Sequence, residues 1–316
     1  MINAQIIHYS AAFITLTLAA LGGGVGQGIA SLATIDAIQR QPCSYQQNFR
    51  TLVIGLALIE SGIIIALVST LMIIFSSQPL TIGIACGELG IAAAIGLAGG
   101  AVSIASSFVV KAATEGIGRQ PFFAAKITTV MLLAQSIMEA PLIIAFIVSL
   151  LIRNRINANP ELLYGLQGLA AGLTIGLGSV GPSIGQAIFT QAACKSISVN
   201  KNAYNKIFPF MLLLEAIIET PFMFCLLIAS MILFRPLDGA ILSDALILGA
   251  AAFAISMGSL GTATGIGFTA SKSVISLAQN PDQYSLLLRT TLLVAAFIES
   301  AIIYAMIVAI MLIMEV

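Results

Sequence analysis

Charged residues are scarce in this chain. Only 8% of its 316 residues are Asp, Glu, Lys or Arg, whereas 59% are hydrophobic; a soluble domain carries about 25% charged residues. Tryptophan is absent, and the four cysteines have neither metal-binding nor disulfide spacing. This composition excludes a soluble globular domain and indicates an integral membrane protein. The formal net charge of zero gives no reason to expect binding to nucleic acid.

Motifs of catalysis are missing as well. The sequence has no phosphate-binding loop, no metal cluster and no nucleophile triad, so we expect no cofactor and no enzymatic activity from the chain itself. The first 30 residues lack a basic segment, and we therefore expect no cleavable signal peptide. The single histidine, His8, falls near the outer end of a predicted helix, where we expect it to be solvated.

Four glutamates each interrupt a long apolar run. They are Glu60, Glu139, Glu219 and Glu299, and successive members lie 79, 80 and 80 residues apart. A charge at the centre of a membrane helix costs about 2.5–3.5 kcal/mol on insertion scales, and no basic residue lies in these runs to pair with it. Such a carboxyl must be neutralised by a proton or a bound cation, and it can release either one when exposed to a channel. The pattern therefore predicts four carriers of single charges.

The spacing of the glutamates defines a tandem repeat. Each unit has a first helix rich in glycine and alanine, a polar loop, and a second helix with larger apolar residues and the glutamate. Small residues let helices pack closely. We predict an all-α membrane protein with eight transmembrane helices in four tandem hairpins, assembling into a ring with an inner glycine-rich layer and an outer layer. The predicted hairpins are residues 1–77, 78–155, 156–235 and 236–316.

Basic residues are distributed unevenly about these helices. Ten of the thirteen Lys and Arg residues lie around the loops within the hairpins, and Arg153, Arg155 and Arg235 lie at the opposite end. The positive-inside rule then places the loops in the cytoplasm and both termini outside.

The motifs of the first hairpin occur in an informative order: Gly24-Val25-Gly26-Gln27-Gly28, then Arg40-Gln41-Pro42, then Glu60-Ser61. This order resembles the c-ring proteolipid, or c subunit, of the rotary ATP synthases, with loops closest to the F-type branch. The second hairpin keeps the loop motif as Arg119-Gln120-Pro121, and each Arg precedes its glutamate by 20 residues. Hairpins 3 and 4 have degraded loops, Val199-Asn200-Lys201 and Gln279-Asn280-Pro281. Most members of the family are single hairpins, so four fused hairpins depart from the usual size.

The resemblance implies a non-catalytic rotor. Several copies of the chain would form a ring in an energy-coupling membrane, which we expect to be a bacterial inner or plasma membrane. Each glutamate would carry an ion past the a subunit of the ATP synthase, and the loops Arg40–Pro42 and Arg119–Pro121 would dock central-stalk subunits. The expected partners are further copies of the chain, the a subunit, the central stalk and membrane lipid, without nucleic acid.

The transported ion is open to two interpretations. In sodium-specific relatives the ion is held by an inner-helix glutamine, the glutamate, the hydroxyl that follows it, and a backbone carbonyl two residues before it. The residues at the glutamine and hydroxyl positions are Gln27 and Ser61 in hairpin 1, Ser106 and Ala140 in hairpin 2, Gln186 and Thr220 in hairpin 3, and Ile266 and Ser300 in hairpin 4. Because the sets are unequal, we predict protons, with a sodium-carrying ring of F- or V/A-type as the alternative and a self-contained channel or transporter as a weaker one. Whether each site lies within one hairpin or between neighbours stays open.

Further polar residues lie near the glutamates. Gln135 and Glu215 each precede a site glutamate by four residues, on the same helix face, and we expect accessory roles for them. Pro141 and Pro221 leave the carbonyls of Ile137 and Ile217 without their usual donor. Those carbonyls occupy the backbone-ligand position, although the prolines could equally serve only to bend the helix.

Overall fold

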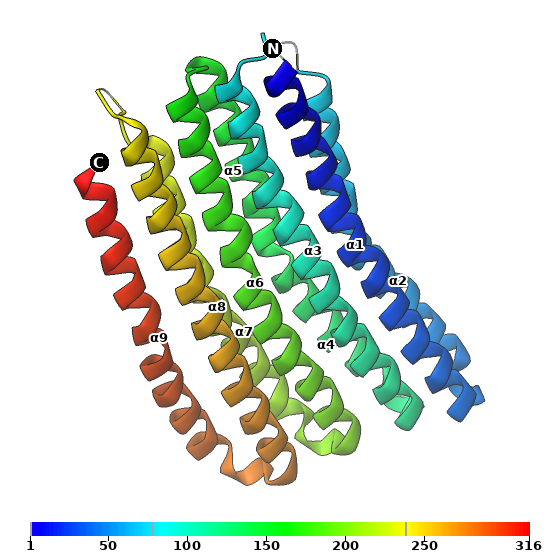
Figure 1. The fold of residues 1–316 in the computed structure, drawn as a ribbon. Coiled ribbons are helices and arrows are strands. Elements are labelled where there is room, and N and C mark those ends of the chain that lie inside the picture. Colours follow the sequence, from blue (N-terminus) through cyan, green and yellow to red (C-terminus); the bar gives the residue numbers. More distant parts are fainter. Residues whose placement is uncertain (1, 77–78, 238) are drawn as a thin grey trace.

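The computed structural model describes residues 2–76, 79–237 and 239–316. Over these residues the secondary structure is helical, without strands (Figure 1). The long helices are α1 (Ile2–Arg40), α2 (Tyr45–Ile74), α3 (Ile82–Arg119), α4 (Ala124–Met138), α5 (Ala140–Ala158), α6 (Leu162–Val199), α7 (Tyr204–Phe234), α8 (Leu242–Gln279) and α9 (Tyr284–Glu315). With α4 and α5 taken as one span, eight helical spans among the described residues are long and apolar enough to cross a membrane. The predicted all-α fold of tandem hairpins is confirmed.

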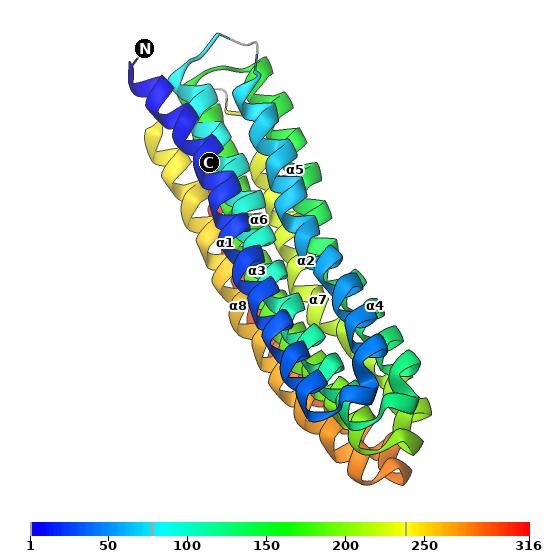
Figure 2. The same ribbon diagram turned by 90° about the vertical axis from the view of Figure 1, so that its right-hand side faces the viewer.

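The helices form two layers, which Figure 2 shows from the side. The glycine-rich layer is the row α1, α3, α6 and α8, and the glutamate layer is the row α2, α4–α5, α7 and α9 (Figure 1). Each hairpin has one helix in each layer, and a single 3-10 turn joins the two. These turns are Pro42–Ser44, Pro121–Phe123, Lys201–Ala203 and Pro281–Gln283. All four hairpins therefore run in the same direction, as expected for repeats related by rotation.

Glycines set the spacing of the glycine-rich layer. A Cβ added at Gly172 of α6 would overlap the backbone carbonyl of Gly90 on α3, and one at Gly165 would overlap the carbonyl of Gly83. The backbones of α3 and α6 thus touch along their flanks, and the neighbouring atoms are main chain that cannot rotate away. In lipid, where apolar surface gains nothing by leaving water, this close van der Waals packing is a main source of helix association.

The two termini lie at one end of the molecule and the four 3-10 turns at the other (Figure 1). Of the predicted hairpin boundaries, the one at residues 77–78 lies outside the described residues. The boundary after Arg155 falls within the last turn of α5, and the boundary after Arg235 comes one residue after the end of α7. Which end faces the cytoplasm stays a prediction.

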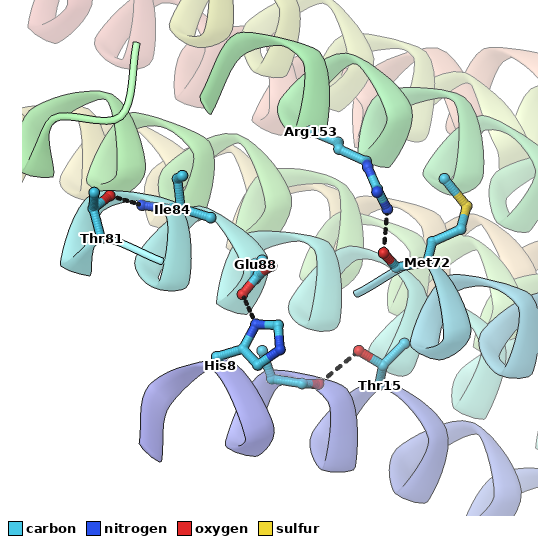
Figure 3. A network of polar contacts seen from close by, with 8 residues as sticks. His8, Thr15, Met72, Thr81, Ile84, Glu88 and Arg153 are labelled. Atoms are coloured by element: carbon cyan, nitrogen blue, oxygen red, sulfur yellow. Dashed lines mark hydrogen bonds and ion pairs between the residues drawn. The ribbon is translucent and has the colours of Figure 1, made fainter. Parts of the chain in front are cut away.

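His8 is buried, so the prediction of a solvated histidine was wrong. Its side chain lies between α1 and α3, with Nδ1 2.6 Å from Glu88 Oε2, and the two residues are 8% and 3% exposed (Figure 3). Near them, Arg153 of α5 donates a hydrogen bond to the carbonyl of Met72 on α2. The physical reason is that α3 brings a carboxyl against the imidazole, and a buried polar group is stable when it has such a partner. These contacts tie hairpins 1 and 2 together at the end that carries the termini.

Candidate functional site

In three hairpins, the site glutamate lies at the same height along the helix axes as the expected glutamine position of the glycine-rich helix. In three hairpins, the glycine one residue before the expected glutamine position packs against the isoleucine one residue before the glutamate. A Cβ on the glycine would lie 3.4, 2.9 and 3.3 Å from the isoleucine Cγ2 in the pairs Gly26–Ile59, Gly185–Ile218 and Gly265–Ile298. The residues that follow are therefore level with one another: Gln27 with Glu60, Gln186 with Glu219, and Ile266 with Glu299.

The hydroxyls contact the glutamate of the next hairpin. Ser61 Oγ of hairpin 1 lies within hydrogen-bond distance of Glu139 Oε1 of hairpin 2, at 3.1 Å. In the same way, the Thr220 hydroxyl of hairpin 3 forms a hydrogen bond with Glu299 of hairpin 4. The sequence left open whether a site lies in one hairpin or between two. The structure pairs these hydroxyls with the carboxyl of the neighbouring hairpin, and not with Glu60 and Glu219.

The other two glutamates have different surroundings. By the relation seen at Glu139 and Glu299, the hydroxyl position that corresponds to Glu219 is on hairpin 2, where Ala140 offers no donor. Glu60 is exposed on the outer flank of α2, at one edge of the molecule. The hydroxyl of Ser300 is on α9, at the opposite edge (Figure 1). Within the chain, Glu60 thus has no hydroxyl from a preceding hairpin, and Ser300 has no glutamate from a following one.

Each hydroxyl also bonds the backbone of its own helix. Ser61, Thr220 and Ser300 donate to the carbonyls of Leu58, Ile217 and Phe297 at 2.7, 2.8 and 2.7 Å. Those carbonyls lie two residues before the glutamates, at the position expected to supply a backbone ligand. The bond forms in hairpins 1 and 4 without a nearby proline, so proline is not what creates it.

The prolines act differently in hairpins 2 and 3. The helical hydrogen-bond pattern is interrupted at the single residue Glu139 between α4 and α5, where the backbone stays right-handed helical, whereas α7 continues through Pro221. Both prolines deprive a carbonyl of its donor. In hairpin 3 the Thr220 hydroxyl satisfies the Ile217 carbonyl, but Ala140 has no hydroxyl for Ile137. The two hairpins thus differ both in the helix pattern at the glutamate and in whether a hydroxyl bonds this carbonyl.

The accessory candidates are all buried. Gln135 Nε2 donates to the Gly55 carbonyl at 3.5 Å, and Glu215 accepts a hydrogen bond from Thr190, a residue that sequence reasoning missed. Thr190 could have been found from its position, four residues after Gln186 on the same face. Ser106 Oγ and both amide atoms of Gln186 have no partner in the described part of the chain.

The loop residues lie together at the end opposite the termini. Arg40 and Arg119 are exposed there, and Phe122 is fully exposed. The 3-10 turn is present in hairpins 3 and 4 although their loop motifs are degraded. The described residues contain no group of three or more His, Cys, Asp or Glu side chains that could hold a metal ion.

Known proteins resemble each of the four repeats. The family model for the C subunit of ATP synthase matches residues 10–73, 89–152, 169–232 and 249–312. The ATP synthase c subunit of Geotalea uraniireducens is 42% identical over 67 residues, which are 21% of this chain and 74% of the relative. The c subunit of Campylobacter curvus is 43% identical over 70 residues, or 22% of this chain and 70% of the relative. The ATP synthase c subunit numbered 2 of Pelobacter propionicus is 36% identical over 77 residues, or 24% and 85%.

A single hairpin of this chain thus corresponds to most of a relative. The four matches begin and end within the helices of successive hairpins and together cover most of the sequence. The chain belongs to the ATP synthase C-subunit family, and it contains four fused copies of the family's helical hairpin.

Proposed function

We propose that this chain is the rotor-ring subunit of a membrane ATP synthase and that it carries protons. Several copies close into a ring, with the glycine-rich layer inside and the glutamate layer facing lipid. Glu60, Glu139, Glu219 and Glu299 each hold one proton while they cross the lipid phase. The a subunit, part of the stator, exchanges these protons with the two sides of the membrane, and ion flow turns the ring.

The hydrogen bonds between hairpins carry this proposal. The carboxyl of one hairpin contacts the hydroxyl of the preceding hairpin at Glu139 and at Glu299. The same relation leaves Glu60 and Ser300 on opposite edges of the chain, where a further copy supplies each with its counterpart. A row of parallel hairpins with complementary edges closes into a ring, and the number of hairpins in that ring is a multiple of four.

The geometry at Glu139 suits a proton. The hydroxyl of Ser61 lies within hydrogen-bond distance of both Glu139 Oε1 and the Leu58 carbonyl. A protonated Glu139 donates to Ser61, and Ser61 donates in turn to Leu58, so both hydrogens have an acceptor. Glu299, Thr220 and Ile217 have the same arrangement. A neutral, fully bonded carboxyl is the form that crosses lipid at least cost.

The ligand sets are too unequal for sodium to be bound at all four sites. Ser106 and Ile266 take the glutamine position beside Glu139 and Glu299, and Ala140 takes the hydroxyl position beside Glu219. Once hydroxyls are assigned between hairpins, the complete set of glutamine, glutamate and hydroxyl occurs at the junction between copies. It comprises Gln27, Glu60 and Ser300 of the neighbouring copy. A ring that passes one stator carries one ion, and protons are the ion that all four sites can hold.

The remaining assignments follow the family. We place the exposed loops of Arg40 and Arg119 in the cytoplasm, against central-stalk subunits, with both termini outside. The chain itself makes no covalent change to a substrate. The membrane is an energy-coupling membrane, and lipid covers the glutamate layer.

Labelling with a hydrophobic carbodiimide, which reacts with protonated carboxyls, tests the proposal. In the assembled complex we expect Glu60, Glu139, Glu219 and Glu299 to be labelled, increasingly so at lower pH and without protection by sodium. The exposed loop residue Glu161 is the control for general reactivity. Sodium protection of all four sites would overturn the proton assignment. Protection of Glu60 alone would show that the junction between copies binds sodium and that the sites are not equivalent.

A further inference from the structure

Hairpin 3 contains a second carboxyl beside its site glutamate. Glu215 on α7 is fully buried, and Thr190 on α6 donates a hydrogen bond to its Oε1. Glu215 precedes Glu219 by one helical turn, so the two carboxyls share a helix face. The equivalent positions in the other hairpins are Leu56, Gln135 and Ala295. A pair of carboxyls is therefore peculiar to hairpin 3.

Gln186 lies beside this pair. It is fully buried, and neither its Oε1 nor its Nε2 has a partner in the described part of the chain. Thr190 comes one turn after Gln186 on α6 and is level with Glu215, while the packing of Gly185 against Ile218 puts Gln186 level with Glu219.

Three buried polar atoms near Glu219 have no hydrogen-bond partner in the described part of the chain. Glu215 Oε2 lacks a partner among the described residues, like both amide atoms of Gln186. Buried polar atoms in proteins are nearly always hydrogen-bonded. These three atoms lie within about one helical turn of one another, so small side-chain rotations would let them bond to each other.

The charge state of Glu215 follows from its neighbours. The titratable group that acts on it is Glu219 on its own helix, and the Cys194 thiol of α6 lies close enough to be affected by Glu215. Among the described residues, no cation from α4, α8 or α9 acts on it, and neither ion pair of the described chain includes it. An isolated charge at such a site would be very unfavourable, so Glu215 holds a proton and has a hydroxyl hydrogen to donate.

Glu219 lacks the donor that two other glutamates have. Ser61 and Thr220 donate to Glu139 and Glu299, but Ala140 stands at the corresponding place beside Glu219. The glutamate that lacks a hydroxyl donor is therefore the one whose own helix carries the extra carboxyl.

We propose that Glu215 is a positioning residue that replaces the missing donor. Its protonated carboxyl donates to Gln186 Oε1, and Gln186 Nε2 donates to Glu219 when Glu219 is ionised. Glu215 keeps its proton throughout, so it stabilises the ionised form of Glu219 without carrying an ion itself. This inference rests on the proposed function, in which Glu219 is a carrier.

The test is the pH at which half of Glu219 is labelled by the carbodiimide, measured by mass spectrometry on the assembled complex. In Glu215→Leu we expect this pH to rise by roughly one unit, because Gln186 loses the partner that holds its amide N–H against ionised Glu219. Leucine is tolerated at the equivalent position of hairpin 1. Glu215→Gln retains an N–H donor and should leave the pH of half-labelling unchanged. Gln186→Leu should reproduce the rise, because the connection passes through Gln186.

A matched control comes from hairpin 2. There, Gln135→Leu removes the equivalent side chain, but Ser61 can still donate to ionised Glu139. The pH at which half of Glu139 is labelled should therefore stay the same. A fall in the pH of half-labelling in Glu215→Leu would show that Glu215 is ionised, and no change would show that it only fills space; either result overturns the inference. If Glu219 is not labelled at any pH, the proposed function fails instead.

Discussion

Gly172→Ala should destabilise the folded chain by about 1–3 kcal/mol, the usual cost of overpacking a core. The added methyl would overlap the carbonyl of Gly90, which is main chain and cannot move without displacing α3. The gain in helix propensity from glycine to alanine, about 1 kcal/mol, offsets only part of this cost. We expect the glycine-rich layer to open between hairpins 2 and 3.

Buried cysteines provide the measurement. Cys194 of α6 is fully buried, with its backbone near Gly116 of α3, and Cys43 is exposed. The rate at which a thiol reagent modifies Cys194, relative to Cys43, therefore reports opening between α3 and α6. For Gly172→Ala the relative rate should rise roughly five- to hundredfold.

Gly249→Ala is the matched control for this substitution. A Cβ at Gly249 would meet nothing within 4 Å, and the equivalent positions in hairpins 2 and 3 are Leu89 and Leu169. The relative rate should therefore stay the same or fall. Equal effects of the two substitutions would contradict the role assigned to the close contact of α3 and α6.

Glu139→Gln should reduce ion-driven ATP synthesis by the whole complex to background. Glutamine keeps the size and polarity of the side chain, but it can neither take up nor release a proton. In the proposed ring every hairpin passes the stator in each turn, so one inactive site per chain should stop rotation even though the other three glutamates are intact. We expect the same loss for Glu60→Gln, Glu219→Gln and Glu299→Gln, measured in reconstituted vesicles with an imposed gradient.

The control is Glu161→Gln, which removes an exposed carboxylate at the start of α6 that makes no side-chain capping bond. Synthesis should be unaffected. Substantial synthesis by any one of the four site variants would show that the hairpin concerned is not a carrier, and the assignment of four carriers would then be wrong for that hairpin.

Much of the fold follows from periodic features of the sequence. The register of four glutamates and the alternation of glycine-rich and large-residue helices suffice to predict four tandem hairpins in two layers. Such features are local, and they recur in each repeat. The contact of Gly172 with Gly90 is a consequence of the same pattern.

Contacts between hairpins could not be predicted in the same way. Ser61 follows Glu60 in the chain and could equally have served that glutamate, since spacing within a repeat does not show which neighbour a side chain meets. The pairing of His8 with Glu88 joins residues 80 positions apart, and nothing in either segment indicates the other. The interruption at Glu139 has no counterpart in α7, although Pro141 and Pro221 have the same spacing from their glutamates.

The mass of the assembly in a mild detergent tests the proposed rotor ring most directly. We expect a closed ring whose protein mass is a whole multiple of 32.8 kDa and whose hairpins number a multiple of four. In that ring, Glu60 of one copy lies against Ser300 of the next. A particle that contains a single chain under every mild condition would contradict the proposal, because Glu60 and Ser300 would then have no counterpart and no ring would exist to turn.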